Sequence, residues 1–300
     1  MTPVLRCFPL PFLAVTLFLA VTGLFTPAFG QLITYDSFNA PSRLIDGNKW
    51  GGFETEFRGT EATRRLDAGK LRLTYRAVGN LAATPAGTFF ADFGLFHPDP
   101  NAVTILQAQI EVVDFEALAC PGNTAPSEVL VGLLGSFFNT GIPVRDTFTN
   151  DVQARIFLVR RSNAPADTVR VEGHIFRCTN ALCTVFDSIQ TRDLGPLACP
   201  GRVCPPVTLR ITWEPAANRF RFLRVGLAEQ IIAYSLSDLR LATRPFRLLS
   251  VAPIVATCTP AGGRKRAFAD ALFDNVVVNT PPASVDPDFD DVDLGELPVP

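Results

Sequence analysis

The sequence of 300 residues has only two histidines, two tryptophans, three tyrosines and one methionine. Neither histidine lies in a Gly-x-Ser-x-Gly context or beside a reactive cysteine, which disfavours nucleophile–base catalysis. His97 precedes Pro98 in a predicted loop and His174 lies within a predicted hairpin, so both are interpreted as surface or packing residues. The shortage of tryptophan and tyrosine also weakens the aromatic signature of a sugar-binding face.

The chain also has little net charge, with a formal value of -2 at pH 7. The chain has 27 basic and 29 acidic residues, and the tail 281–300 contains six acids and no lysine or arginine, so the rest is near neutral. No concentrated basic face indicates a nucleic-acid partner. The tail matches an EF-hand calcium loop at its first three aspartates, from Asp286, but has Asp291 in place of glycine and Leu297 in place of glutamate. We therefore predict a solvated, disordered tail.

The N-terminus carries a single charge, Arg6, ahead of the apolar run 8–25. The run leads to the sequence Ala-Phe-Gly30, which has small residues at the two positions that a signal peptidase reads. This pattern predicts a secretory signal peptide over residues 1–30, with cleavage after Gly30. The alternative, a membrane anchor, is disfavoured because the run is short and two prolines interrupt its start. We expect a secreted or periplasmic protein with no membrane span after cleavage.

Six cysteines remain after this cleavage, and an even number in an exported chain indicates disulfides. Four of them form two pairs with equal C-x4-C spacing, Cys178–Cys183 and Cys199–Cys204. Such a spacing suits a bridge across a tight turn, where the two Cα atoms can approach the roughly 5.5 Å that a disulfide prefers. The alternative is that these four cysteines bind one zinc ion.

The remaining cysteines, Cys120 and Cys258, are predicted to form a third disulfide, mainly by elimination. Each follows a predicted long strand at a turn that contains proline or glycine. The tetrapeptide Ala-Cys-Pro-Gly occurs at both 119–122 and 198–201, so pairing of Cys120 within the cluster 178–204 is the alternative.

No stretch of a dozen residues has a convincing helical stripe, whereas alternation with a period of two recurs along the chain. Apolar residues alternate from Val207 to Trp213, and after a turn Phe220 and Phe222 alternate with arginines, so Trp213 is predicted to be a core residue. Further strands are predicted at Lys70–Tyr75, Thr104–Glu116, Glu128–Phe138, Asp151–Arg160, Thr168–Arg177, Cys183–Gln190, Ile231–Ser235, Phe246–Val255 and Phe273–Val278. A single helical turn is expected at Leu236–Leu241. The sequence therefore predicts one all-β domain over residues 31–280, with two packed antiparallel sheets.

Four motifs carry a family resemblance: YDSF at 35–38, LIDGNKW at 44–50, GKLRLT at 69–74 and ADALFDNVVV at 269–278. This layout resembles the concanavalin A-like lectin/glucanase superfamily, in its bacterial laminin-G-like branch. The resemblance implies a jelly-roll sandwich whose terminal strands are neighbours in one sheet. It is poorly specific for function, because the superfamily includes lectins, carbohydrate-binding modules, glycosidases, lyases and adhesins.

The enzymes of this superfamily carry three acids, E-x-D-x-E or E-x-D-x-x-E, on one central strand. The nearest match is Glu111-Val-Val-Asp114-Phe-Glu116. In a regular strand Asp114 and Glu116 share a face, and Glu111 points to the other. Only a bulge between Glu111 and Asp114 would bring all three to one face. We therefore treat the trio as a weak catalytic candidate and interpret Asp114 and Glu116 as a solvent-facing pair.

The resemblance also implies a possible structural calcium ion, since several members hold one. The adjacency of the terminal strands would bring Asp36 close to Asp274. The candidate ligands near the matching strands are Asp36, Asp46, Asp274 and Asn275. The alternative is that these side chains make hydrogen bonds at strand ends.

Trp50, which precedes two glycines, is the weak candidate for an exposed ligand-binding platform, with packing as its other possible role. The resemblance and the imperfect acidic motif together predict a secreted, non-catalytic binding module for glycans. Two alternatives stay open: a polysaccharide hydrolase or lyase, and a surface structural or adhesion protein without a small ligand.

Overall fold

The computed structural model describes residues 32–39, 45–54, 60–79, 87–88, 91–118, 126–165, 167–255 and 265–280. The predicted signal peptide, Cys120, Cys258 and the acidic tail lie outside the described residues.

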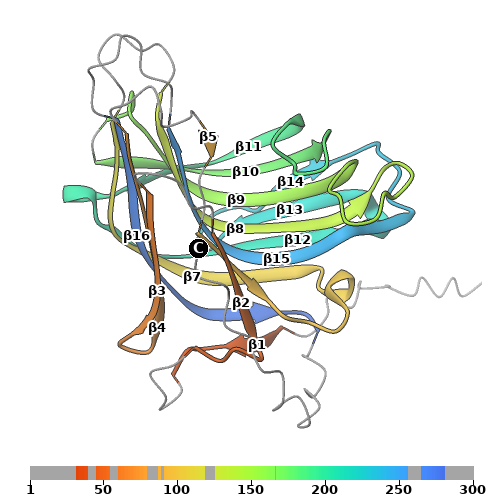
Figure 1. Cartoon of the computed structure of the whole chain (residues 1–300), viewed down its shortest axis with the longest axis horizontal. Helices are drawn as coiled ribbons and strands as arrows, with labels where there is room; N and C mark the ends of the chain where they lie inside the picture. The colour runs from red at the N-terminus through yellow and green to blue at the C-terminus, as the bar shows by residue number, and fades with distance from the viewer. Residues whose placement is uncertain are drawn as a thin grey trace, which may run out of the picture. The chain divides into compact units, whose positions relative to one another are not determined.

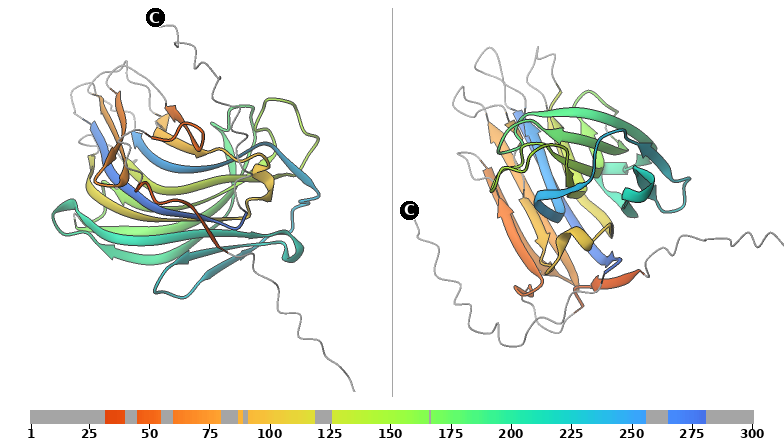
Figure 2. Two further views of the ribbon diagram at one scale, coloured as in Figure 1. Left: turned by 90° about the horizontal axis from the view of Figure 1, so that it is seen from below. Right: turned by 90° about the vertical axis from the view of Figure 1, so that its right-hand side faces the viewer.

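The described strands form two antiparallel sheets, here called sheet A and sheet B (Figure 1, Figure 2). Sheet A has the order β14-β13-β12-β7-β16-β4-β3, with β1 also paired to β16. Its strands are β1 (Ile33–Asp36), β3 (Thr60–Asp67), β4 (Lys70–Gly79), β7 (Ile105–Leu118), β12 (Cys204–Glu214), β13 (Arg219–Arg224), β14 (Gln230–Ala233) and β16 (Lys265–Val278). The pairing of the terminal strands β1 and β16 confirms the adjacency that the resemblance implied.

Sheet B has the order β11-β10-β9-β8-β15-β6-β2, with β5 also paired to β15. Its strands are β2 (Trp50–Glu54), β5 (Gly87–Thr88), β6 (Ala91–Leu95), β8 (Glu128–Asn139), β9 (Asp151–Arg161), β10 (Thr168–Cys178), β11 (Phe186–Ala198) and β15 (Arg240–Val255). The chain crosses between the sheets repeatedly: on either side of β2, from β4 to β5, from β6 to β7, from β7 to β8, from β11 to β12 and on either side of β15. The predicted fold class, an all-β jelly-roll sandwich of two antiparallel sheets, is confirmed.

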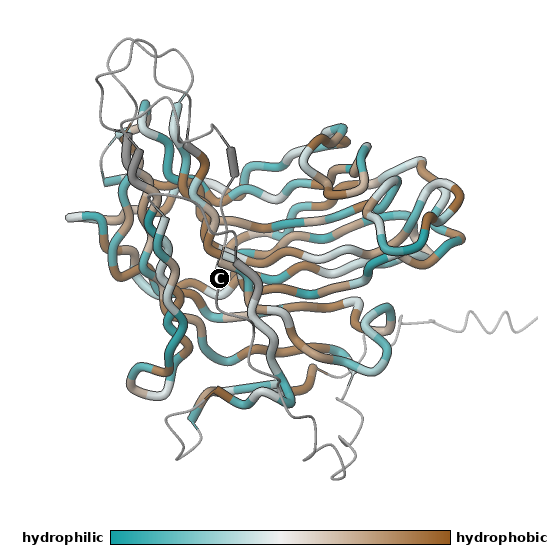
Figure 3. The backbone as a smooth tube through the Cα atoms, viewed as in Figure 1, coloured by the Kyte–Doolittle hydropathy of each residue, from teal (hydrophilic) through white to brown (hydrophobic). Residues whose placement is uncertain are grey.

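Hydrophilic and hydrophobic residues alternate along many of the strands (Figure 3). This alternation buries one row of side chains from each sheet between the two layers. On β13, Phe220 and Phe222 are fully buried, whereas Arg219 and Arg221 on the other face are only half-buried. Trp213 is buried as predicted, and its indole donates a hydrogen bond to the hydroxyl of Tyr234 at 2.9 Å. The inner rows of both sheets merge into one large core cluster.

Two local predictions are wrong. The strand predicted from Cys183 begins only at Phe186, because Cys183 has a left-handed φ of 55° and belongs to the turn before β11. No helical turn forms at Leu236–Leu241. Instead, Arg240 and Leu241 already pair with the end of β8, and this pairing extends β15 into the region.

Both short cysteine pairs form disulfides. The Cα atoms of Cys178 and Cys183 lie 4.8 Å apart, and those of Cys199 and Cys204 lie 4.2 Å apart. The first bridge closes the turn between β10 and β11, and the second closes the turn between β11 and β12. These four cysteines are therefore not zinc ligands, because their thiols are oxidised in pairs.

Candidate functional site

The predicted acidic trio lies on β7, which contains a bulge. Asp270 and Ala271 of β16 are consecutive, yet they pair with Asp114 and Val112 of β7, which leaves Val113 as an extra residue. The bulge lies between Glu111 and Asp114, which is the position that the acidic motif requires.

The bulge changes which side chains share a face. Val112 and Phe115 on either side of it are both buried in the core. Glu111, Asp114 and Glu116 are all half-buried, on the outer face of sheet A. The geometry thus brings the three carboxylates to one face, which regular strand geometry would not do.

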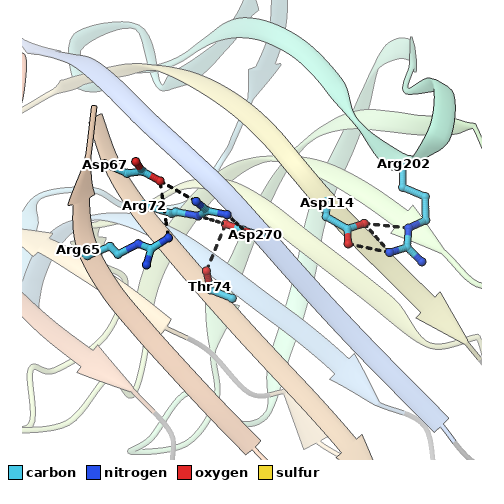
Figure 4. Close-up of polar contacts among 7 residues, drawn as sticks. All are labelled: Arg65, Asp67, Arg72, Thr74, Asp114, Arg202 and Asp270. Carbon is cyan, nitrogen blue, oxygen red and sulfur yellow. Dashed lines mark hydrogen bonds and ion pairs between the residues drawn. The ribbon is translucent and has the colours of Figure 1, made fainter. Parts of the chain in front are cut away.

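Each of these carboxylates is already bound to a basic side chain. Lys70 Nζ donates to Glu111 at 2.6 Å. Arg202 donates to both oxygens of Asp114 at 2.8 and 2.7 Å (Figure 4). It also donates to Glu116 at 2.9 Å. Such charge-assisted pairs occupy the lone pairs that a sugar hydroxyl would need. The arrangement does not favour catalysis by this trio.

The turn before β12 positions Arg202. This turn, Pro200–Arg202, is a short 3-10 segment in which both Gly201 and Arg202 have positive φ, at 59° and 71°. A positive φ is unusual for arginine, and the neighbouring bridge Cys199–Cys204 closes the same turn. The turn directs the guanidinium onto β7.

A second ion-pair cluster continues this pattern on sheet A (Figure 4). Arg72 donates to both oxygens of Asp270 at 2.8 and 2.5 Å and to Asp67 at 2.6 Å, while the Thr74 hydroxyl donates to Asp270 at 3.2 Å. The hydrogen bonds to the two aspartates raise the pKa of Arg72 above its usual range. In this part of sheet A the charges are matched by partners within the sheet.

Trp50 is not an exposed platform, which corrects that expectation in favour of packing. Its side chain is only 3% exposed and stacks on Phe93, with ring centroids 5.1 Å apart. The indole donates to Asp36 at 2.8 Å, so this pair ties β1 to β2.

The calcium candidates likewise make local hydrogen bonds. Asp46 accepts from the backbone of Asn48 at 3.0 Å, Asp274 accepts from the backbone of Asn275 at 2.7 Å, and Asp36 accepts from the Trp50 indole. Across the described ranges, no group of three or more His, Cys, Asp or Glu side chains could hold a metal ion. The calcium site stays a prediction without a donor cluster to support it.

The outer face of sheet B has a pocket of about 380 Å³, here called the sheet B pocket. Its lining residues come from β8, β9, β10 and β11: Glu128, Leu130, Arg155, Phe157, Val159, Arg161, Glu172, His174 and Thr191. The inward residues of β9, such as Ala154 and Ile156, are fully buried in the core, so Arg155 and Phe157 face outward. Phe157 and Val159 belong to a small apolar cluster separate from the main core.

Both carboxylates of the pocket bind the same arginine. Arg161 donates to Glu128 at 2.8 Å and to the two oxygens of Glu172 at 2.6 and 2.8 Å. The hydrogen bonds from Arg161 hold the pKa of Glu172 below its usual range.

Arg155 is different. Within the part of the chain that the structure describes, no hydrogen bond or ion pair engages its guanidinium. Instead, it lies 5.7, 5.2 and 6.0 Å from the ring centroids of Phe157, Phe176 and Phe186. Burial lowers the pKa of Arg155 below its usual range, although an arginine remains charged near neutrality.

His174 lies directly opposite Arg155 in the β9–β10 register and opposite Thr191 on β11. Its Nε2 atom is 2.8 Å from the Ser188 hydroxyl, and its side chain is largely buried. Burial, followed by the nearby positive charge of Arg155, lowers its pKa to about 4. The imidazole is therefore neutral at physiological pH and can both donate and accept hydrogen bonds.

The sequence analysis treated His174 only as a surface or packing residue and did not single out Arg155, Arg161 or Glu172. A signal was present in the sequence. Arg155 and Phe157 lie two positions apart in one predicted strand and so share a face, and Glu172 and His174 do the same in the next strand. His97, by contrast, lies in a loop as expected, and its Nδ1 atom is close to the backbone of Asp99.

No family model matches the sequence, and no curated protein matches it. Among solved structures, LamAcat from Zobellia galactanivorans is similar at 11% identity and a TM-score of 0.44, over 84% of this chain and 98% of that one. SCLam, a non-specific endo-β-1,3(4)-glucanase from family GH16, is 14% identical with a TM-score of 0.41, over 83% and 92% of the two chains. The carbohydrate-binding module CBM66 from Bacillus subtilis is 11% identical with a TM-score of 0.29, over 73% and 93%. At these identities and TM-scores the likeness bears on neither ligand nor activity.

The described segments also contain no helix of the length and apolar character needed to cross a membrane.

Proposed function

We propose that this protein is a secreted, non-catalytic module that binds a glycan in the sheet B pocket. The observation that carries the proposal is the pocket itself, which combines aromatic rings with the unpaired guanidinium of Arg155 on an exposed sheet face. Its volume of about 380 Å³ falls within the range of small-ligand sites. The two disulfides support an oxidising compartment outside the cytosol.

The arrangement of carboxylates supports binding without catalysis. Hydrolysis of a glycosidic bond usually needs one carboxylic acid as proton donor and one carboxylate as nucleophile or base. In the pocket, Glu128 and Glu172 are both bound by Arg161, and on sheet A the acidic trio is bound by Lys70 and Arg202. Among the described residues, neither the pocket nor the acidic trio offers a pair of carboxylates without a bound cation.

The second candidate is a polysaccharide hydrolase or lyase. The β7 bulge favours it, because it brings Glu111, Asp114 and Glu116 to one face, although its place between Glu111 and Asp114 differs from the pattern of the laminarinase-like glycosidases. This candidate needs a ligand that displaces Lys70 and Arg202 from the carboxylates.

A glycan array combined with a reducing-end release assay tests the proposal on the mature protein. We expect retention of a glycan without release of sugar. Thr191 lies at the pocket and is exposed, so Thr191→Trp should fill the pocket and abolish retention. Thr63→Trp, at an exposed site on β3 of sheet A, is the matched control and should retain binding. Release of sugar would establish the enzyme instead, and silence in both assays would favour a structural protein.

A further inference from the structure

Arg155 is a cation whose hydrogen-bonding capacity is unused. A guanidinium has five N–H donors in a planar fork, and the described residues engage none of those of Arg155. By contrast, Arg161, six positions along the same strand, donates to two glutamates. The Arg155 side chain is half-buried, so a bound acceptor would replace water at these donors with charge-assisted hydrogen bonds.

The charges of the pocket are balanced, but its hydrogen bonds are not. Arg155, Arg161, Glu128 and Glu172 have a net charge of zero together, and His174 is neutral near pH 7. Because both glutamates are bound to Arg161, the N–H donors of the pocket that lack an acceptor are those of the Arg155 guanidinium. The pocket therefore suits a group that carries one negative charge and two acceptor oxygens, whereas a group with a second negative charge in the pocket would be repelled by the glutamates.

The surroundings of Arg155 would strengthen such a contact. Phe157, Phe176 and Phe186 lie around the guanidinium at 5.2 to 6.0 Å. Aromatic side chains exclude water from the fork and lower the local dielectric constant, so a charge-assisted hydrogen bond made there is stronger than at an open surface. Phe186 is itself 42% exposed and offers an apolar surface beside the pocket.

We propose that the glycan of the sheet B pocket carries a carboxylate, as a uronic acid does, and that the fork of Arg155 binds it through two parallel hydrogen bonds. The inference rests on the proposed function and narrows it to acidic glycans. A carboxylate is planar and matches the guanidinium fork in a way that a lone hydroxyl does not. The imidazole of His174, which lies opposite Arg155, and the hydroxyl of Thr191, which lies opposite His174 on β11, supply hydrogen-bonding groups for the ring hydroxyls.

The test compares matched polymers that differ only in the carboxyl group. The mature protein is titrated with uronate polymers (polygalacturonate, polymannuronate, polyguluronate and hyaluronate) and with the same polymers after chemical reduction of their carboxyl groups to alcohols. We expect at least one acidic polymer to bind about tenfold or more tightly than its reduced form. Arg155→Met should weaken that binding by about the same factor, and Arg155→Lys should restore part of it because the charge returns without the fork.

Arg202→Met is the matched control, since it removes an arginine from sheet A, and it should bind like the wild type. Equal affinity for acidic and reduced polymers, or full affinity in Arg155→Met, would overturn the carboxylate proposal. If the protein bound acidic and reduced polymers equally and Thr191→Trp abolished that binding, the proposed glycan function would stand and only the carboxylate proposal would fall. Failure to bind any polymer of the panel or any glycan of the array would overturn both proposals. Binding of dextran sulfate that survives Arg155→Met would show only non-specific charge attraction and would contradict the role of the fork.

Discussion

Among the described residues, Arg155 on sheet B differs from Arg72 and Arg202 on the side of sheet A in its partners. On sheet A, Arg72 and Arg202 each bind two acidic side chains, so their charges are matched inside the protein. On sheet B, Arg155 lies among phenyl rings and faces a neutral histidine, with no acidic partner bound to it among the described residues. Matched charges contribute to folding, whereas a half-buried charge without a partner costs stability and stays available to a ligand. The contrast supports the proposal that the binding face lies on sheet B.

The largest expected effect lies on sheet A. Arg72→Met leaves Asp270 without its bidentate partner, and Asp270 is only 8% exposed. We expect the free energy of unfolding to fall by about 3 kcal/mol, because a nearly buried carboxylate loses its cation. Urea denaturation measures this value.

Arg65→Met is the control for that variant. The Arg65 side chain is 61% exposed and only 3.7 Å from Asp67, so its loss should cost less than about 0.5 kcal/mol. Equal losses for Arg65 and Arg72 would mean that the ion pairs of sheet A are not what stabilises it.

The second effect is a pH dependence that arises from His174 on sheet B. Its pKa is about 4 in the folded protein, below the usual value of about 6.5 in an unfolded chain. Between these values the unfolded chain binds a proton that the folded protein does not, so stability falls as the pH decreases from about 6.5 to about 4. The full difference amounts to about 3 kcal/mol.

His174→Gln keeps a polar group near Ser188 and removes the titration. The variant should therefore show a shallower loss of stability between about pH 6.5 and pH 4 than the wild type, as measured by urea denaturation across that range. The carboxylates that also titrate in this window are common to both proteins and cancel in the difference. Parallel pH profiles would show that the imidazole is not excluded from water.

A third pair of variants compares two arginines of one strand. Arg161→Met leaves Glu128 and Glu172 without a cation, and we expect a loss of about 2 kcal/mol, because these side chains are partly buried. Arg155→Met replaces an unpaired guanidinium among phenyl rings by an apolar side chain, and we expect a gain of about 1 kcal/mol. Chemical denaturation of both variants gives the signs, and a loss in Arg155→Met would mean that its guanidinium contributes to folding.

The sequence predicted the layers of the fold well but the sites poorly. Period-two alternation was sufficient to place Trp213 and Phe220 in the core, because inward and outward positions follow from the strand alone. The β7 bulge was not predictable, since it depends on how β7 and β16 align across many intervening residues. For Trp50 the sequence left exposure and packing both open, and packing is what the structure shows, because its burial depends on a distant partner, Phe93.

The pocket shows the same limit. Arg155 faces outward on β9, and Glu172 and His174 face outward on β10. The alternation within each strand is sufficient to predict these orientations. Their meeting depends on the hairpin register, which places Arg155 opposite His174. A register shift of one residue would move every side chain of a strand to the other face, so alternation alone could not identify the site.

The smallest expected effect concerns the acidic trio and tests the comparison most directly. In Arg202→Met, Asp114 and Glu116 lose their guanidinium, but the Arg202 and Asp114 side chains are 39% and 34% exposed, so water replaces much of the interaction. We expect a loss of at most about 1 kcal/mol in the free energy of unfolding, which should shrink further in high salt as the charges are screened.

The same variant removes the guanidinium from Asp114 and Glu116 beside the β7 bulge, so it also tests the enzyme alternative. We expect no release of reducing ends from β-glucans by either the wild type or the variant. Hydrolysis by the wild type that Arg202→Met alters would make sheet A the functional face and would invert the assignment of the two faces.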